Sequence, residues 1–161
     1  MEKKEKKRIM FLCHGNICRS PMAEMVMKDL VKKAGRQDDF IIESAAVSDE
    51  ETGNGIYPPA KREMFSRGIP FTEHRAHKIT RGEFDSSDLV IIMDESNRRL
   101  LRHITGSGSD TSKVHLLMEY TGFPRSVADP WYTGDFDTAF DDIMEGCRAL
   151  CSHLGVTIPE K

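Results

Sequence analysis

A nucleophile and a cation frame one short stretch, residues 13–20. Cys13 and Arg19 lie six positions apart, and Gly15 between them lets the backbone turn tightly. A thiolate is a strong nucleophile, and a guanidinium binds an oxyanion through two parallel hydrogen bonds. The stretch therefore indicates a site in which a sulfur nucleophile faces a bound anion such as a phosphate group.

The elements on both sides of this stretch support an anion site. The apolar run 9–12 predicts a buried strand, and an amphipathic helix is expected directly afterwards, with Ser20 as its N-cap and Pro21 at its first position. The loop between them leaves several backbone N–H groups without partners at the positive end of the helix dipole. These N–H groups, the dipole and the arginine all favour the thiolate over the thiol.

Composition and charge limit the class of protein. A chain of 161 residues is long enough for its own core, and we expect one domain over 1–161, with residues 1–7 as a frayed basic N-terminus. The formal net charge of -3 argues against nucleic acid as a partner. No stretch of the sequence approaches the roughly 20 apolar residues of a membrane span, and the apolar run after the basic start is too short for a signal peptide. We therefore expect a cytoplasmic monomer without a membrane partner.

The chain carries four cysteines, Cys13, Cys18, Cys147 and Cys151, and is neither short nor evidently secreted, so structural disulfides are not expected. Cys147 and Cys151 share one face of a predicted helix and are interpreted as small core residues. A zinc site at Cys13, His14 and Cys18 is disfavoured, because no second ligand pair has a suitable spacing and an arginine would be repelled by the metal. We expect neither a metal nor another cofactor.

Predicted strands and helices alternate along the chain. The strands are expected over 8–13, 40–46, 89–93 and 114–118; the helices over 21–34, 58–68, 97–104 and 136–154, with Asp94 or Ser96 capping the third and a helical turn within 71–84. This order predicts an α/β fold, a three-layer sandwich in which a four-stranded parallel sheet has helices on both faces. Ligands of such sheets bind at the carboxyl ends of the strands, where Cys13 is expected to lie.

The run 13–21 closely resembles the signature of the low-molecular-weight protein tyrosine phosphatases. Further motifs follow in the family's order, namely Ser44-Ala45-Ala46, His74-Arg75-Ala76, Met93-Asp94-Glu95-Ser96-Asn97 and Asp129-Pro130-Trp131-Tyr132. The resemblance covers nearly the whole chain beyond Lys7. It implies cofactor-independent hydrolysis of phosphotyrosine on proteins and of small aryl phosphates, the acid phosphatase activity of the family, through a cysteinyl-phosphate intermediate.

The resemblance also implies the catalytic roles. Cys13 would attack phosphorus, Arg19 would bind the phosphate and its transition state, and Asp129 would protonate the leaving group and then activate water. Pro130 stiffens the loop that holds this carboxyl group, and a nearby phosphate favours its protonated form. The remaining residues expected to contact the substrate are His14, Gly15, Asn16, Ile17, Cys18, Ser20, Trp131 and Tyr132.

Residues behind the loop are expected to support it. Asn16, Ser44 and His74 match family positions that hydrogen-bond behind the loop and hold its strained shape. Ser20 is expected to donate a hydrogen bond to the thiolate, in addition to capping the helix or instead of it. Cys18 matches a second loop cysteine that can form a disulfide with the nucleophile and shield it from further oxidation.

The rim of the predicted pocket departs from the family pattern in part. Trp131 and Tyr132 are expected to form a wall on which a flat aryl group stacks. The family often has an aromatic residue near Glu50, where this chain has the acidic run 49–51, which would disfavour acidic peptides by repulsion. His14 replaces a residue that is usually apolar, and His77 stands where the family commonly has Arg, so that one supporting ion pair is expected to change.

Two alternative functions stay open on sequence grounds. A thiol-dependent arsenate reductase of the same fold would need further cysteines on a segment near 89–105, and the sequence has none there. An inactive phosphate-binding adaptor is disfavoured by the joint presence of Cys13, Arg19 and Asp129. Parallel assays of arsenate reduction and phosphate-ester hydrolysis would separate these classes.

Overall fold

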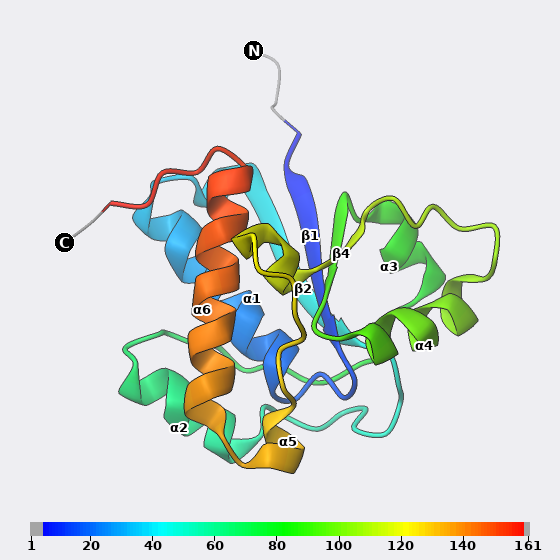
Figure 1. The fold of residues 1–161 in the computed structure, drawn as a ribbon, viewed down its shortest axis with the longest axis horizontal. Helices are drawn as coiled ribbons and strands as arrows, with labels where there is room; N and C mark the ends of the chain where they lie inside the picture. Colours follow the sequence, from blue (N-terminus) through cyan, green and yellow to red (C-terminus); the bar gives the residue numbers. More distant parts are fainter. Residues whose placement is uncertain (1–4, 160–161) are drawn as a thin grey trace.

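A computed structural model describes residues 5–159, which contain a four-stranded sheet with helices on both faces (Figure 1). The strands are β1 (Lys7–Cys13), β2 (Phe40–Ala46), β3 (Leu89–Ile92) and β4 (Val114–Leu116), in the spatial order β2-β1-β3-β4. All three neighbouring pairs are parallel, so each connection has to cross from one end of the sheet to the other. The predicted three-layer α/β sandwich is confirmed.

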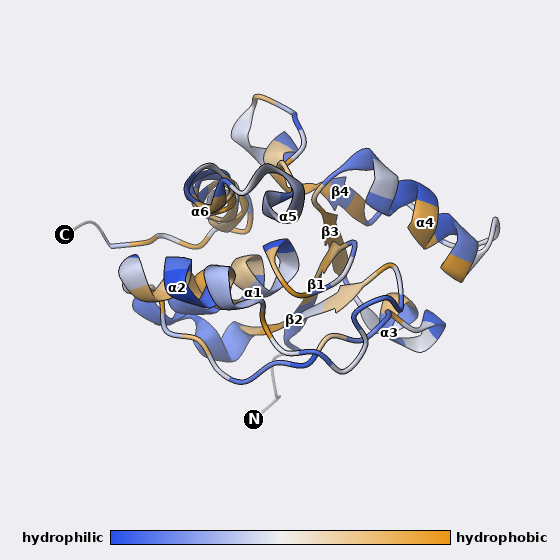
Figure 2. Ribbon diagram, turned by 90° about the horizontal axis from the view of Figure 1, so that it is seen from below, coloured by the Kyte–Doolittle hydropathy of each residue, from blue (hydrophilic) through white to orange (hydrophobic). Residues whose placement is uncertain are grey.

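Two groups of helices cover the sheet. The helices are α1 (Arg19–Lys33), α2 (Pro58–Ser66), α3 (Arg81–Ser86), α4 (Glu95–Thr105), α5 (Pro130–Thr133) and α6 (Phe136–His153), with 3-10 turns η1 (Gln37–Asp39) and η2 (Leu117–Thr121). Helices α1, α2 and α6 lie on one face of the sheet, and α3 and α4 lie on the other (Figures 1 and 2). The short helix α5 lies at the end of the sheet where β1 stops, beside the start of α1 (Figure 1).

The central strand β1 contributes to both hydrophobic cores, because successive side chains of a strand point to opposite faces. Ile9, Phe11 and Cys13 pack in the core beneath α1 and α6. Met10 and Leu12 pack in the second core with residues of α3 and α4. The strands are accordingly hydrophobic, whereas the helices show hydrophilic outer faces (Figure 2). Strand alternation thus directs Cys13 toward the α1 side.

The ends of two strands differ from the prediction. A frayed N-terminus is predicted over residues 1–7, but Lys7 already belongs to β1 and pairs with Phe40, so this expectation is wrong for Lys7. Residues 1–4 lie outside the described part of the chain. Strand β4 ends at Leu116 rather than at 118, because the chain turns directly into η2 and buries Leu117 and Met118 instead of continuing along the sheet. The other strand boundaries agree with the prediction to within one residue.

Aspartates cap three of the helices, namely α4, α5 and α6. Asp94 caps α4, as predicted, and accepts a hydrogen bond from the backbone N–H of Asn97 at 3.0 Å. Ser96, the other predicted cap, lies inside the first turn, where its hydroxyl donates to Asp94 Oδ1 at 2.6 Å. The sequence analysis missed α5, which Asp129 caps by accepting from the backbone N–H of Trp131 at 3.0 Å.

Cys147 and Cys151 lie buried in α6 with free thiols, which confirms their interpretation as core residues. Burial raises the pKa of the Cys147 thiol and raises that of Cys151 to about 11.

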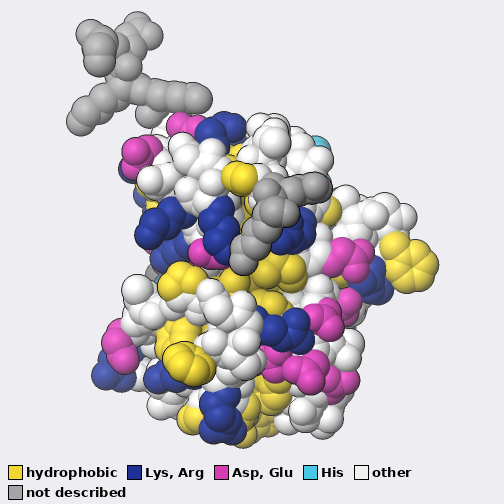
Figure 3. Space-filling view, turned by 90° about the vertical axis from the view of Figure 1, so that its left-hand side faces the viewer, with side chains coloured by type: hydrophobic (Ala, Val, Ile, Leu, Met, Phe, Trp, Pro, Cys, Tyr) yellow, Lys and Arg dark blue, Asp and Glu magenta, His cyan; other side chains and the backbone are white. Residues whose placement is uncertain are grey.

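The surface that is on the left in Figure 1 has a mixture of basic, acidic and hydrophobic side chains (Figure 3). Of the helices that the structure describes, none has both the length and the apolar character that crossing a membrane requires.

Candidate active site

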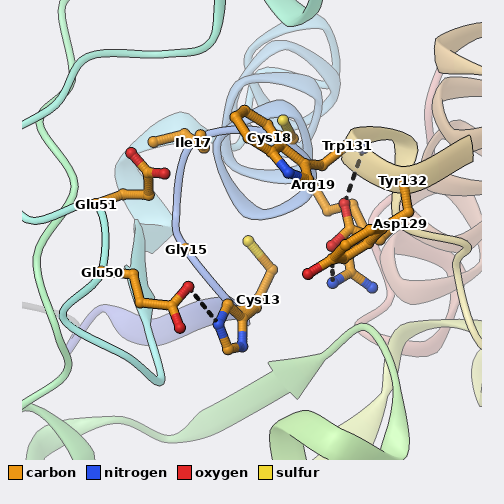
Figure 4. A pocket seen from close by; sticks show the side chains of 11 residues that line it. Cys13, Gly15, Ile17, Cys18, Arg19, Glu50, Glu51, Asp129, Trp131 and Tyr132 are labelled. Atoms are coloured by element: carbon orange, nitrogen blue, oxygen red, sulfur yellow. Dashed lines mark hydrogen bonds and ion pairs between the residues drawn. The ribbon is translucent and has the colours of Figure 1, made fainter. Parts of the chain in front are cut away.

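A cavity opens at the carboxyl end of β1 (Figure 4). Its lining residues are Cys13, His14, Gly15, Ile17, Cys18, Arg19, Glu50, Glu51, Asp129, Trp131 and Tyr132. The structure therefore brings the three predicted catalytic residues to one cavity, although Asp129 lies 110 positions after Arg19 in the chain. Of the predicted substrate-contacting residues, Asn16 and Ser20 do not line it but are fully buried.

The start of α1 differs from the prediction that Ser20 caps the helix and Pro21 opens it. Helix α1 begins at Arg19, and Cys18 occupies the N-cap position without a side-chain cap. Ser20 lies inside the first turn, and its Oγ is 3.0 Å from Cys13 Sγ. The serine hydroxyl is thus engaged by the sulfur atom and is not available to cap the helix.

The loop before α1 offers free backbone donors. The N–H of Asn16 donates to Cys13 Sγ at 3.3 Å. Among the backbone hydrogen bonds of the described residues, none has the N–H of Gly15, Ile17 or Cys18 as its donor. Free N–H groups at the start of a helix favour an anion, both as hydrogen-bond donors and through the helix dipole. The loop therefore has the features expected of an oxyanion cradle.

Asn16 holds the loop in a left-handed conformation, with φ of 60°. Its side-chain amide donates to Ser20 Oγ at 2.8 Å and to Ser44 Oγ at 3.0 Å. Its Oδ1 lies 2.8 Å from His74 Nε2 and accepts from the backbone N–H of His77 at 3.4 Å. The NH₂ group of Asn16 donates to both serines, so the oxygen Oδ1 is the atom that faces His74. Because Oδ1 can only accept a hydrogen bond, the proton of the His74 ring is assigned to Nε2. These four contacts compensate for the strain of a left-handed asparagine.

A buried carboxylate completes this cluster. Glu24 is only 6% exposed, and its Oε1 accepts from Ser44 Oγ at 2.5 Å. Its Oε2 accepts from Lys28 Nζ at 2.6 Å, and His74 Nδ1 lies 3.8 Å from Oε1. Burial lowers the pKa of His74 despite the nearby Glu24 carboxylate. The sequence analysis missed Glu24, whose one signal is an acidic residue within the apolar stretch of a predicted helix.

The cluster orients one proton toward the sulfur. Ser20 Oγ already accepts a hydrogen bond from Asn16, so its own proton must go to another acceptor. Cys13 Sγ lies at 3.0 Å, whereas the carbonyl oxygen of Ala45 lies at 3.5 Å. The shorter contact makes the sulfur the better acceptor of this proton.

Arg19 is only 2% exposed, and its two terminal nitrogens make three polar contacts. Nη1 donates to Asp94 Oδ2 at 2.7 Å and to the carbonyl oxygen of Val127 at 2.9 Å, and Nη2 donates to Asp129 Oδ2 at 3.3 Å. Its Nε is buried and has no partner among the described residues. Burial alone would lower the pKa of Arg19, but Cys13 and the two carboxylates outweigh it and raise the pKa. The guanidinium is therefore fixed, charged and left with a free N–H.

Asp94 both caps α4 and holds Arg19. Burial alone would raise the pKa of this carboxyl group, but hydrogen bonds from Ser96 and Arg19 outweigh that effect and lower the pKa. The sequence analysis identified Asp94 only as a cap, because nothing in its local sequence indicates a contact with a residue 75 positions away. One side chain therefore couples the start of α4 to the cavity floor.

The two cysteines of the loop differ in their environments. Burial raises the pKa of the Cys18 thiol, and the neighbouring Cys13 raises it further. Cys18 thus stays protonated near neutral pH, whereas Cys13 receives the hydrogen-bond donors described above. Within residues 5–159, no group of three or more His, Cys, Asp or Glu side chains is arranged to hold a metal ion.

One side of the cavity mouth is aromatic. Trp131 is 49% exposed and Tyr132 is 82% exposed, and both follow the residue that caps α5 (Figure 4). Trp131 packs against Tyr57, with ring centroids 4.7 Å apart. The backbone N–H of Tyr57 donates to the carbonyl oxygen of Ile17 at 2.9 Å. Tyr57, which the sequence analysis missed, therefore connects the aromatic side with the loop.

The other side of the mouth is acidic. Glu50 and Glu51 lie across the cavity from Asp129 and Tyr132 (Figure 4). Glu50 Oε2 is 3.0 Å from Nε2 of His14. His14, which replaces a usually apolar residue of the family, therefore has an acidic partner. The cavity is thus bounded by aromatic rings on one side and by carboxylates on the other.

Comparison with known proteins identifies the family. The sequence profile described as low molecular weight phosphotyrosine protein phosphatase matches residues 8–158. The chain belongs to this family. The human low molecular weight phosphotyrosine protein phosphatase is 36% identical over 157 residues, covering 93% of this chain and 97% of that protein. The phosphatase YfkJ of Bacillus subtilis is 32% identical over 148 residues, covering 91% and 94%.

Solved structures show the same fold. The crystal structure of YfkJ has a TM-score of 0.90 at 31% identity and covers 96% of this chain and 98% of its own. A low molecular weight protein tyrosine phosphatase of Streptococcus pyogenes has a TM-score of 0.82 at 38% identity, covering 92% and 93%. The chain is therefore an enzyme of the low molecular weight protein tyrosine phosphatase class.

In this phosphatase the residues identified from sequence form two groups. Cys13, Arg19 and Asp129 line the cavity, and Asn16 lies behind it with the predicted supporting residues Ser44 and His74. The residues that sequence reasoning missed are Glu24, Tyr57 and Val127. Val127 contributes only its carbonyl oxygen, so its side chain carried no signal.

Proposed function

We propose that the phosphatase hydrolyses phosphotyrosine on proteins, and small aryl phosphates, through a cysteinyl-phosphate intermediate. Cys13 is the nucleophile, Arg19 binds the phosphate and its transition state, and Asp129 is the general acid and then the general base. One observation carries this proposal: the sulfur, the guanidinium and the carboxyl group line a single cavity at the start of α1. The family supports the reaction class, and the geometry supports these three roles.

In the first step the Cys13 thiolate attacks phosphorus. The bond between phosphorus and the phenolic oxygen breaks, its electron pair goes to that oxygen, and the oxygen takes a proton from Asp129. The hydroxyl of Ser20 and the N–H of Asn16 stabilise the sulfur anion before the attack, at 3.0 and 3.3 Å. Cys18 does not compete as a nucleophile, because burial raises the pKa of its thiol.

Arg19 and the free N–H groups of the loop stabilise the charge that develops on the phosphoryl oxygens. The two terminal nitrogens of Arg19 are already held by Asp94, Val127 and Asp129, so the guanidinium does not have to be ordered when the anion binds. Its buried Nε lacks a protein partner and is available to a phosphate oxygen.

In the second step a water molecule attacks the cysteinyl phosphate. Asp129, now ionised, accepts a proton from this water, the bond between phosphorus and sulfur breaks, and inorganic phosphate forms. The sulfur leaves as a thiolate, which the donors from Ser20 and Asn16 stabilise again. The contact between Asp129 and Nη2 of Arg19, at 3.3 Å, keeps the carboxyl group beside the phosphate site.

The alternative functions receive no specific support. Cys147 and Cys151, the only cysteines of the sequence outside the loop, lie buried in α6. There they contact Ala23 and Met27 of α1 and do not line the cavity, so they cannot relay electrons from its sulfur as an arsenate reductase requires. An adaptor without turnover would not require the Cys13 sulfur and the Asp129 carboxyl group to line the same cavity.

The test is hydrolysis of p-nitrophenyl phosphate by the wild type and two variants. We expect Cys13→Ser to lose turnover, and Asp129→Ala to slow it by about 10²- to 10³-fold, the typical contribution of a general acid. Asp135→Ala, which removes the cap of the neighbouring helix α6, is the matched control and should keep turnover. A chelator should change nothing, whereas chelator-sensitive activity that survives Cys13→Ser would reject the mechanism.

A further inference from the structure

The acidic side of the cavity mouth has no role in the proposed reaction, which uses residues at the floor of the cavity. Glu50 and Glu51 line the cavity, but neither contacts Arg19, the cation of the floor. We propose that these two carboxylates select phosphotyrosines that are flanked by a lysine or an arginine in the substrate polypeptide. This inference rests on the proposed function and names the substrate class of the same site.

Both carboxylates retain capacity for a cation. The Glu50 side chain is 67% exposed, and its one partner among the described residues is the His14 ring at 3.0 Å. Glu51 accepts from the neutral side-chain amide of Asn54 at 2.6 Å. Across residues 5–159, no ion pair joins either glutamate to a lysine or an arginine. A basic side chain of a substrate would therefore be their first permanent cationic partner.

Glu51 is also held close to the phosphate-binding loop. A Cβ atom added to Gly15 would lie 3.2 Å from Glu51 Cγ, so this side chain packs directly over the loop. Glu50 reaches the loop through His14, the residue next to Cys13. Because both side chains contact the loop, a polypeptide whose phosphate occupies the cradle must pass its neighbouring residues near these carboxylates.

The charges of the cavity are segregated by depth. Arg19 lies at the floor, is only 2% exposed, and is paired with Asp94 and Asp129. The rim carries Glu50 and Glu51, and Glu50 contacts the His14 ring. A phosphate is therefore held at the floor by Arg19 and the loop N–H groups, while the residues beside it meet negative charge. Such an arrangement attracts a basic neighbour and repels an acidic one.

The test compares three phosphotyrosine peptides that differ only in the residues on both sides of the phosphotyrosine, which are lysine, alanine or glutamate. For the wild type we expect kcat/KM for the lysine peptide to exceed that for the glutamate peptide by about tenfold, since two exposed pairs each contribute a few-fold. Salt at about 0.5 M should reduce this ratio, because it screens exposed charges. Peptides with lysine on one side only then show which neighbour is recognised.

The decisive variant is Glu50→Gln combined with Glu51→Gln, which should bring the ratio close to one. The matched control is Asp85→Asn combined with Asp110→Asn, which removes the same charge from exposed positions in α3 and in the loop before β4 and should keep the ratio. A wild-type ratio near one, or a ratio that the glutamate variants retain, would overturn the inference.

Hydrolysis of p-nitrophenyl phosphate separates this inference from the proposed function, because this ester has no neighbouring residues. Wild-type hydrolysis of the ester together with equal rates on all three peptides would overturn the selectivity alone. No hydrolysis of the ester would overturn the proposed function and the inference with it. We expect the ester to be hydrolysed equally by the wild type and by the control variant Asp85→Asn combined with Asp110→Asn.

Discussion

Two polar regions flank Cys13 and differ in burial. Behind the loop, Asn16, Ser44 and Glu24 are 0%, 2% and 6% exposed, and each makes several hydrogen bonds to protein. At the rim, the side chain of Glu50 is 67% exposed, and Tyr132 is 82% exposed. A buried polar group that loses its partner carries the full cost of desolvation, whereas water replaces a lost partner at the rim. Changes behind the loop should therefore affect folding and chemistry together, and changes at the rim should affect substrate preference alone.

Asn16→Ala should have the largest effect, because it removes four contacts and leaves an alanine at a positive φ. We expect a loss of about 2–4 kcal/mol in the free energy of unfolding, from strain and unpaired buried groups. We also expect a fall of about 10²-fold in kcat/KM from the displaced loop. Urea unfolding and steady-state kinetics measure both. Asn16→Gly is the control, since it tolerates the positive φ but lacks the contacts; equal stability of the two variants would exclude a contribution from strain.

Asp94→Asn should have the next largest effect. The asparagine still caps α4, but Arg19 loses one of its two carboxylate partners, so kcat/KM should fall about tenfold, and the free energy of unfolding by about 2 kcal/mol at pH 7. Because the folded-state pKa of Asp94 is lowered, its contribution is complete above the unfolded value of about 3.9 and disappears as the pH falls through the folded value. The stability difference from the wild type should therefore vanish in acid. Glu95→Gln, an exposed neighbour, should show no such pH dependence.

His74→Gln should change how stability depends on pH. Burial lowers the pKa of His74, so below about pH 6.5 the unfolded state binds a proton that the folded state does not. The free energy of unfolding of the wild type should therefore decrease as the pH falls from 6.5, with a slope of at most about 1.4 kcal/mol per pH unit from this group. The glutamine variant, which can still donate to Asn16, should lack this part of the slope. His103→Gln, at an exposed site, should retain it; identical slopes in both variants would contradict the assignment.

Tyr132→Ala should have the smallest effect, because this side chain is exposed at the rim. We expect KM for an aryl phosphate to rise by about two- to tenfold through loss of the aromatic contact, with kcat unchanged. The free energy of unfolding should stay within about 0.5 kcal/mol of the wild type. Phe123→Ala, which removes an exposed ring that does not line the cavity, should leave KM unchanged. A stability loss as large as that of Asn16→Ala would abolish the contrast between the two regions.

The fold could be predicted from sequence because its signals are local. The apolar run in β1, the amphipathic helices and their Gly35 and Gly155 ends are visible in windows of a few residues. The position of the site could also be predicted, because parallel strands bring their carboxyl ends to one edge of the sheet, where ligands bind. Asp129, which the resemblance gave as the general acid, also caps α5 beside the cavity.

Several contacts that organise the site, such as those of Arg19 with Asp94 and of Ser44 with Glu24, could not be predicted, because they join distant residues. The position of Ser20 before Pro21 predicts a cap, which is wrong, whereas its expected hydrogen bond to the sulfur agrees with the 3.0 Å contact to Cys13. His77 stands where the family commonly has Arg, and it still finds an acidic partner, since its Nε2 lies 2.8 Å from Glu83. Sequence patterns specify which surfaces are apolar, but they do not specify which polar groups meet once those surfaces pack.

The position of β1 between β2 and β3 has a consequence for local opening. Its backbone is hydrogen-bonded on both sides, whereas α5 is a single helical turn at the rim. In native-state hydrogen exchange, the central amides of β1 should exchange only through global unfolding, and those of α5 through much smaller fluctuations. The aromatic side of the mouth can therefore open and close many times while the sulfur atom stays in place.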